Sequence, residues 1–201
     1  MFLQKLKSET ANSHFTLEQN PYSINLMNPN VSLDDYSNYL QRLYGFVFGF
    51  ERTVFPKLQE IDPDINLRRK SELMHHDLLK LKCDFTKIPT FSEEAFNHHY
   101  ANNLTALGGL YVLEGSMLGG VMIKKHLTEK LGNKVVNKME YFTGYGSETG
   151  KVWRDFLNIL SFHATDIEKE KIIINSANNT FDLLNQWIAP HPPKIIYMNG
   201  Y

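Results

Sequence analysis

Several features that would point to particular classes of protein are scarce in this 201-residue sequence. Cysteine occurs once, at Cys83, so no internal disulfide can form, and we expect a protein of a reducing, cytoplasmic compartment. Charge imbalance is also small, because 21 Lys and Arg stand against 22 Asp and Glu. A chain without a broad basic field has little to hold a phosphate backbone, so we expect no nucleic acid partner.

Long hydrophobic runs are missing as well. The first residues, MFLQKLKSETANSHF, turn polar too early for the apolar core of a signal peptide, and no run of about 18 apolar residues follows. We therefore expect a protein that is neither exported nor bound to a membrane. Repeats, low-complexity tracts and long linkers are absent from the sequence too, which predicts a single domain over residues 1–201.

Strand patterns are scarce, and helical periodicity takes their place. The segment 133–142 is too short and isolated to found a sheet. The all-α bundle that we predict instead places ligand sites between facing helices, and residues 189–201 form an irregular tail. The expected helices cover residues 3–17, 33–58, 66–82, 92–132, 147–162 and 166–188. The second of them begins with a capping box at Ser32 and Asp35 and is kinked or ended by Pro56.

His14 lies on the apolar face of the first expected helix. At about 100° per residue it is about 20° from Leu3 and about 40° from Thr10, and Lys7 falls within about 20° of the same direction. One interpretation is a core histidine beside a lysine that extends its charge to water. The other is a ligand with an apolar body, a central metal and acidic edges, because imidazole is a common iron ligand.

Five glycines gather in the segment GGLYVLEGSMLGG, residues 108–120. In a helix they would cost about 5 kcal/mol relative to alanine, so something must require them. Close helix packing explains two or three of them. The rest suggest a bent helix laid over a planar ligand, with the backbone at Gly115, Gly119 and Gly120 close to it.

Together these two segments carry a family resemblance. LKSETANSHFTLE resembles the proximal-helix motif of haem oxygenases, and EGSMLGGVMIKK resembles their glycine-rich distal-helix motif. YVLEGS and GYGSETGKVWRDF are most similar to the bacterial, phytochrome-associated branch, and the likeness extends from Leu6 to about Phe156. The resemblance implies a single-domain helical bundle that holds haem between a proximal helix and a bent, glycine-rich distal helix.

The resemblance also implies roles for individual residues. His14 corresponds to the haem iron ligand, and Lys7 to a basic residue that binds a haem propionate. Gly115, Gly119 and Gly120 correspond to the distal glycines that pack against haem. Ser116 stands where the animal enzymes have an aspartate, and with Gly115 it would form the distal environment for water and oxygen.

The propionate-binding set departs from the family pattern. A second basic residue, usual one turn before the histidine, is replaced here by Ala11. Lys151 and Arg154 in the sixth expected segment are therefore further candidates for binding propionates.

For the reaction, the resemblance implies that haem b is both cofactor and substrate, and that O2 cleaves it to biliverdin, carbon monoxide and ferrous iron. No GxGxxG follows a strand pattern, so the electrons would come from a separate ferredoxin or reductase. The biliverdin could serve a photoreceptor, or haem cleavage could serve iron recovery.

Two other functions remain open. A haem carrier or sensor would bind through His14 without turnover. A di-metal oxidase would use the Glu-x-x-His motif at Glu72 and His75, but a di-iron bundle needs two such motifs and the sequence has one. Further residues that could serve as metal ligands are His76, Asp77, His98, His99 and Glu114. A purely structural domain is disfavoured by the joint presence of His14, Lys7 and the glycines.

Overall fold

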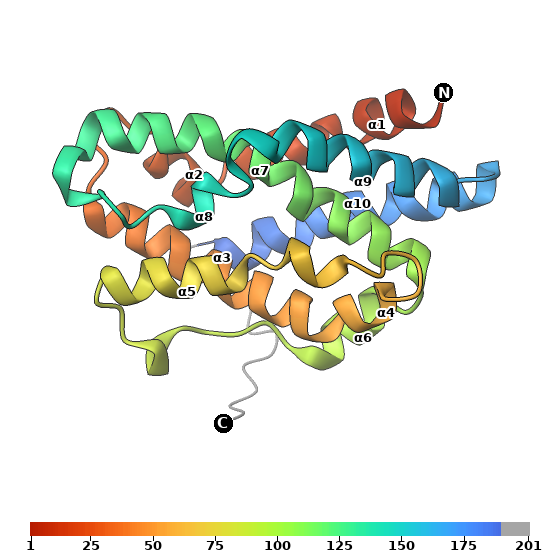
Figure 1. Cartoon of the computed structure of the whole chain (residues 1–201), viewed down its shortest axis with the longest axis horizontal. Helices are drawn as coiled ribbons and strands as arrows, with labels where there is room; N and C mark the ends of the chain where they lie inside the picture. Colours follow the sequence, from red (N-terminus) through yellow and green to blue (C-terminus); the bar gives the residue numbers. More distant parts are fainter. Residues whose placement is uncertain (190–201) are drawn as a thin grey trace.

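A computed structural model describes residues 1–189, and all regular elements in this range are helices, as the sequence predicted (Figure 1). Most of the expected tail therefore lies outside the described residues. The α-helices are α1 (Phe2–Glu18), α2 (Pro21–Leu26), α3 (Leu33–Thr53), α4 (Phe55–Leu58), α5 (Ser71–Lys80), α6 (Glu93–His99), α7 (Asn103–Leu131), α8 (Glu140–Thr143), α9 (Thr149–His163) and α10 (Ile167–Ile188). Short 3₁₀ turns are η1 (Ile65–Arg68), η2 (Phe85–Lys87), η3 (Gly132–Lys134) and η4 (Gly146–Glu148).

The capping box that predicts the start of α3 is present. The Asp35 N–H donates to Ser32 Oγ at 3.1 Å, and the Ser32 N–H donates to Asp35 Oδ2 at 2.9 Å. These bonds satisfy two backbone donors that a helix start leaves unpaired. At the other end α3 stops at Thr53, and Pro56 lies in the first turn of the short α4. The predicted break near Pro56 is confirmed, but it comes at Val54, before the proline.

The single helix predicted from Ser92 through the glycine segment is wrong, because the chain forms two helices there. α6 is capped by Ser92 and ends at His99, and α7 restarts after Asn102. The Asn102 side chain accepts the N–H groups of Leu104 and Thr105, both at 3.0 Å. An asparagine that caps in this way favours a new helix start over continuation.

The helix predicted over residues 66–82 is shorter than expected. Only Ser71–Lys80 forms α5, and η1 lies before it. The carboxylate of Glu51 on α3 accepts the N–H groups of Lys70 and Ser71 and the Ser71 hydroxyl. A side chain of another helix therefore fixes where α5 begins.

α7 is the central helix of the bundle and packs on α10, α9, α8 and α4. In Figure 1 it changes direction near its middle, as the predicted bent helix would. Gly132, with a φ of +54°, ends it at the predicted position. Within residues 1–189, Asn103–Lys134 is also the one helical stretch that is long and apolar enough to cross a membrane, because it contains an 18-residue window with a mean hydropathy of 1.4. Half of that window is buried, as in the core helix of a globular bundle.

Two of the five glycines allow this central packing. A Cβ on Gly108 would lie 2.5 Å from the carbonyl oxygen of Ile173 on α10. A Cβ on Gly109 would lie 2.6 Å from the Tyr100 ring and 2.7 Å from the Phe50 ring. Because real Cβ atoms do not come so close to their neighbours, larger residues would push α10 and the aromatic core away from α7.

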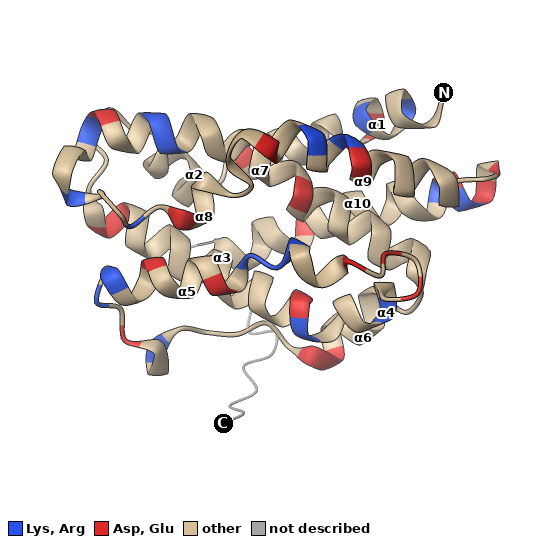
Figure 2. Cartoon of the chain, in the orientation of Figure 1, with Lys and Arg blue, Asp and Glu red and all other residues tan. Residues whose placement is uncertain are grey.

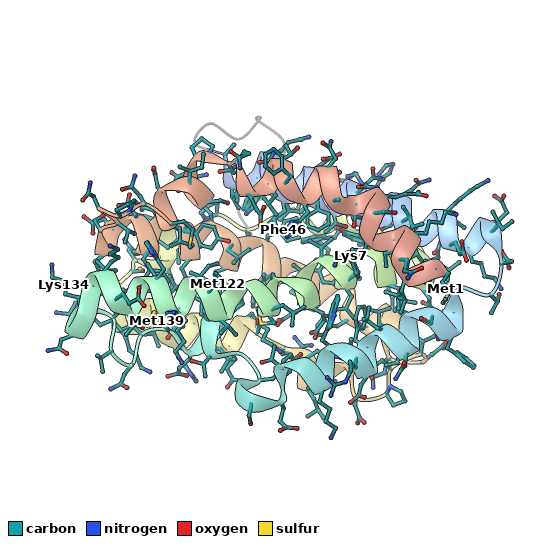
Figure 3. The ribbon with its side chains drawn as sticks, turned by 90° about the horizontal axis from the view of Figure 1, so that it is seen from above. Met1, Lys7, Phe46, Met122, Lys134 and Met139 are labelled. Carbon is teal, nitrogen blue, oxygen red and sulfur yellow. The ribbon has the colours of Figure 1, made fainter. Side chains whose placement is uncertain are left out.

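α1 lies beside the bundle and packs mainly on α10. Leu6 and Thr10 are its buried residues, and Lys5 pairs with Glu170 of α10 at 3.2 Å. Figures 1 and 3 show that α1 and α7 run in the same direction along the molecule. Two parallel helices that both rest on α10 therefore frame the candidate site.

Candidate ligand site between α1 and α7

α1 and α7 approach each other at Thr10 and Tyr111. Burial raises the pKa of the Tyr111 phenol, and the nearby Thr10 side chain opposes that rise. One helical turn further on, α1 presents His14 and α7 presents Gly115. His14 and Gly115, predicted to lie on the proximal and distal sides of a ligand site, are thus each one helical turn beyond the same contact between α1 and α7.

His14 does not face the core, so that part of the sequence prediction is wrong. Its side chain is 56% exposed, although on the helix it lies about 40° from the buried Thr10 and about 80° from the buried Leu6. Its ring meets the ring of Phe181 edge-on at 5.5 Å between centroids, and its Nδ1 lies 3.7 Å from Glu18 Oε1. The imidazole is thus accessible to a ligand while two neighbours orient it.

The distal glycines differ in what surrounds them. A Cβ on Gly119 would meet no atom within 4 Å, and one on Gly115 would lie at ordinary contact distance, 3.6 Å, from Trp153. Gly120 is buried, and its Cβ would lie 3.3 Å from Phe142 of α8. Packing within residues 1–189 therefore accounts for the tight space at Gly120 but not for the glycine at position 119.

Large apolar side chains are exposed around Gly119. Leu118, Val121 and Met122 of α7 are 42%, 57% and 69% exposed, and Phe15, next to His14, is 58% exposed. Figure 3 marks Met122 on α7 and Lys7 on α1. Exposed apolar area next to an uncovered glycine is the kind of surface that a flat, apolar ligand would cover.

Ser116 lies on α7 next to Gly115 and is exposed. Its hydroxyl donates to the carbonyl oxygen of Leu113 at 2.7 Å, and its oxygen lies 3.4 Å from the hydroxyl of Tyr141 on α8. Burial raises the pKa of Tyr141, so its phenol stays protonated and can donate toward Ser116. The distal surface thus has a pair of hydroxyl groups.

The three basic candidates, Lys7, Lys151 and Arg154, are all exposed. Lys7 belongs to α1, and the other two belong to α9, which packs on α7 and touches α1. Within residues 1–189 no carboxylate pairs with any of them. Their charges are available for an anionic ligand.

A cluster of buried charged side chains packs around Glu114 of α7, and the sequence pattern did not predict it. Glu114 is 3% exposed, accepts a hydrogen bond from the Tyr145 hydroxyl at 2.8 Å and lies 3.4 Å from Arg68 Nη1. Arg68 Nε also donates to Asp62 at 2.7 Å, and Lys70 lies over the Tyr145 ring. A glutamate within the apolar α7 segment is the one sequence feature that could have indicated this cluster.

Other residues that could have bound a metal make different contacts. Asp77 is fully buried and accepts the backbone N–H groups of Glu140 and Tyr141, each at 2.9 Å, while His76 lies 3.3 Å from Glu140. Within residues 1–189 no three His, Cys, Asp or Glu side chains come close enough to hold a metal ion. The structure therefore gives the di-metal interpretation no support.

Fold and site define an all-helical bundle in which an exposed histidine on α1 lies near a glycine-rich stretch of α7 with an uncovered glycine. Residues 1–190 match the family model described as Heme oxygenase, so the chain belongs to the haem oxygenase family and is a haem-degrading enzyme. This confirms the family expected from the two motifs. No protein of curated function matches the chain in sequence.

Solved haem oxygenases share the fold. The enzyme from Leptospira interrogans matches with a TM-score of 0.81 at 11% identity, over 94% of this chain and 98% of that chain. The NO- and CO-bound enzyme from Neisseria meningitidis matches with a TM-score of 0.75 at 21% identity, over 98% and 99%. Haem oxygenase-1 from Synechocystis sp. PCC6803, in complex with haem, matches with a TM-score of 0.74 at 15% identity, over 93% and 90%.

Proposed function

We propose that this enzyme cleaves haem with O2 and externally supplied electrons to biliverdin, carbon monoxide and ferrous iron. The main supporting observation is the exposed, oriented His14 next to a surface of α7 where Gly119 has no packing partner. Haem is the substrate as well as the group that activates O2, so the protein contributes binding, orientation and polar groups.

On the proximal side, His14 would bind the haem iron. Its Nδ1 lies on the side of Glu18, 3.7 Å from Oε1, and Nε2 would be the atom left for the metal. The edge-on contact with Phe181 limits rotation of the ring. Lys7, Lys151 and Arg154 would pair with the two propionates at the haem edge.

On the distal side, the open backbone at Gly119 and the ordinary contact distance at Gly115 would let the haem plane lie close to α7. The Ser116 hydroxyl would bind water at this surface. The bend of α7 and the exposed Leu118, Val121 and Met122 would limit which haem edge is attacked.

The electrons would come from a separate protein, a ferredoxin or a reductase. Residues 1–189 contain no strand, so they hold no strand–turn–helix site for a nicotinamide or flavin nucleotide. A cytoplasmic location agrees with the lone Cys83. The biliverdin could then be used by a photoreceptor.

Spectroscopic titration tests this function. Addition of haem should produce a Soret band, and addition of a reductant under O2 should replace that band with biliverdin absorbance. H14A should lose most of the turnover, whereas H98A, which alters another exposed histidine, should behave as wild type. A Soret band that persists under turnover conditions would instead identify a haem carrier, and full activity in H14A would rule out His14 as the iron ligand.

A further inference from the structure

An open pocket lies between the second half of α7, α8 and the end of α5. Its volume is about 600 Å³, which is within the range of pockets that hold small organic molecules. It forms where the chain leaves α7 and turns back through η3 to α8. The lining residues that matter for a ligand are Lys80, Lys124, Val136, Asn137, Met139 and Thr143.

This pocket faces away from the candidate haem surface. Lys124 and Thr128 form its α7 wall, and at about 100° per residue they lie about 140° and 180° around the helix from the uncovered Gly119. α8 packs on the pocket side of α7, where Phe142 lies 3.3 Å from the Cβ position of Gly120. A ligand in the pocket would therefore leave Gly119 open to haem.

The pocket lies in a basic part of a nearly neutral chain. Within residues 121–143 five lysines stand against Glu129 and Glu140, whereas the whole chain has a net charge of -1. Figure 2 shows Lys or Arg on the second half of α7 and at the end of α5, both at the same end of the molecule. Because a concave site concentrates the field of the charges that line it, this pocket should attract anions.

Lys124 is the pocket cation with unused hydrogen-bonding capacity. Lys80 is already paired with Glu140. Lys124 is partly buried and donates to Thr143 Oγ1 at 2.7 Å, but among the described residues no carboxylate lies within ion-pair distance of it. An ammonium has three N–H donors, so two remain for an anion in the pocket.

The wall between η3 and α8 suits an anion that has an apolar part. Val136 is 53% exposed, and Met139 lines the same wall. Asn137 follows Val136 and adds an amide with two N–H donors. The three terminal oxygens of a phosphate group could accept from the ammonium and the amide together, while an apolar body covers Val136.

We propose that this pocket binds an organic phosphate, with its phosphate group against Lys124 and Asn137 and its apolar body against Val136 and Met139. The inference does not depend on haem cleavage, because none of these residues belongs to the candidate haem site. Lys124 belongs to α7, and the other three residues precede α8 directly. A bound ligand would therefore bridge α7 to the segment that leads into α8.

Lys124→Met tests the phosphate contact, with phenyl phosphate as the probe in isothermal titration calorimetry. Wild type should bind phenyl phosphate, and K124M should bind it at least about tenfold more weakly, because methionine keeps most of the side chain and removes the charge. K125M is the matched control, since Lys125 is the next residue, pairs with Glu129 and does not line the pocket. Equal affinity in wild type and K124M would overturn the proposal, as would no binding to wild type.

Val136→Ser tests the apolar contact. Inorganic phosphate lacks an apolar body, so wild type should bind it more weakly than phenyl phosphate. V136S should lose most of this difference, because its affinity for phenyl phosphate falls while its affinity for inorganic phosphate stays the same. If wild type bound the two probes equally well, the pocket would not select an organic phosphate.

Two further measurements locate the bound probe. Protein saturated with haem should bind phenyl phosphate with the affinity of the haem-free protein, whereas competition with haem would place the probe at Lys7, Lys151 or Arg154 and overturn the proposal. Phenyl phosphate should also slow amide hydrogen exchange in residues 135–143, and unchanged exchange there would exclude this pocket. If wild type forms no biliverdin, the proposed function fails, but the calorimetric results still decide the phosphate site.

Discussion

Gly108 and Gly119 are both glycines of α7, but their surroundings differ. A Cβ at position 108 would lie 2.5 Å from the Ile173 carbonyl oxygen, whereas one at position 119 would meet nothing within 4 Å. The first glycine is explained by contact with α10. The second loses about 1 kcal/mol of helix stability relative to alanine with no gain inside the protein, which indicates a requirement from outside it.

Alanine at each position should separate these two requirements. G108A should lower the free energy of unfolding by about 1–3 kcal/mol, because α10 must move away from α7. G119A should raise it by up to about 1 kcal/mol, because alanine favours the helix, yet it should weaken haem binding. Urea unfolding and Soret titration of both variants measure these effects, and unchanged haem affinity in both G119A and G119L would remove Gly119 from the binding surface.

At the scale of elements, the position of α8 depends on one side chain of α5. α8 has four residues, too few to be stable alone, and Asp77 accepts its Glu140 and Tyr141 N–H groups at 2.9 Å. Asp77 thereby acts as a cap supplied by a different helix. Because Tyr141 and the neighbouring Phe142 contact Ser116 and Gly120, this cap also positions part of the distal side.

Asp77→Asn should therefore loosen α8. An amide has one acceptor oxygen where the carboxylate has two, so one buried N–H loses its partner and the protein should lose about 1–3 kcal/mol of stability. Amide hydrogen exchange should accelerate at Glu140 and Tyr141 before it does in α3 or α10. D155N changes an exposed aspartate and should have no such effect. Unaltered exchange in D77N would show that packing alone holds α8.

Local patterns predicted most of these elements, and tertiary contacts explain the exceptions. The cap at Ser32 and the stop at Gly132 involve neighbours in sequence, so the sequence was sufficient. The start of α5 was misplaced because Glu51, distant in sequence, holds it. The candidate site shows the same division. Sequence motifs predicted His14 and Gly119, whereas Lys70 and Tyr141, distant in sequence, are brought to the same cavity only by the fold.

At the scale of the whole molecule, buried ionisable groups link stability to pH. Burial raises the pKa of Glu51 and Glu114 and lowers that of Lys70. The raised carboxyl groups favour folding at low pH and lose that contribution as the pH rises through their folded pKa values. The lysine acts in the opposite direction, because its folded pKa of about 8 lies below the ordinary 10.5.

Lys70 should therefore make the protein more stable as the pH rises from about 8 to 10. In this window the unfolded chain keeps the lysine proton that the folded chain has released, so the unfolded state binds more protons and the free energy of unfolding increases with pH. The gain could approach about 3 kcal/mol and disappears as the pH falls through 8. Urea unfolding of wild type and K70M at the same pH values isolates it, since tyrosines and carboxyl groups titrate in both proteins. A difference between the two proteins that stays constant from pH 7 to 10 would show that Lys70 keeps an ordinary pKa in the fold.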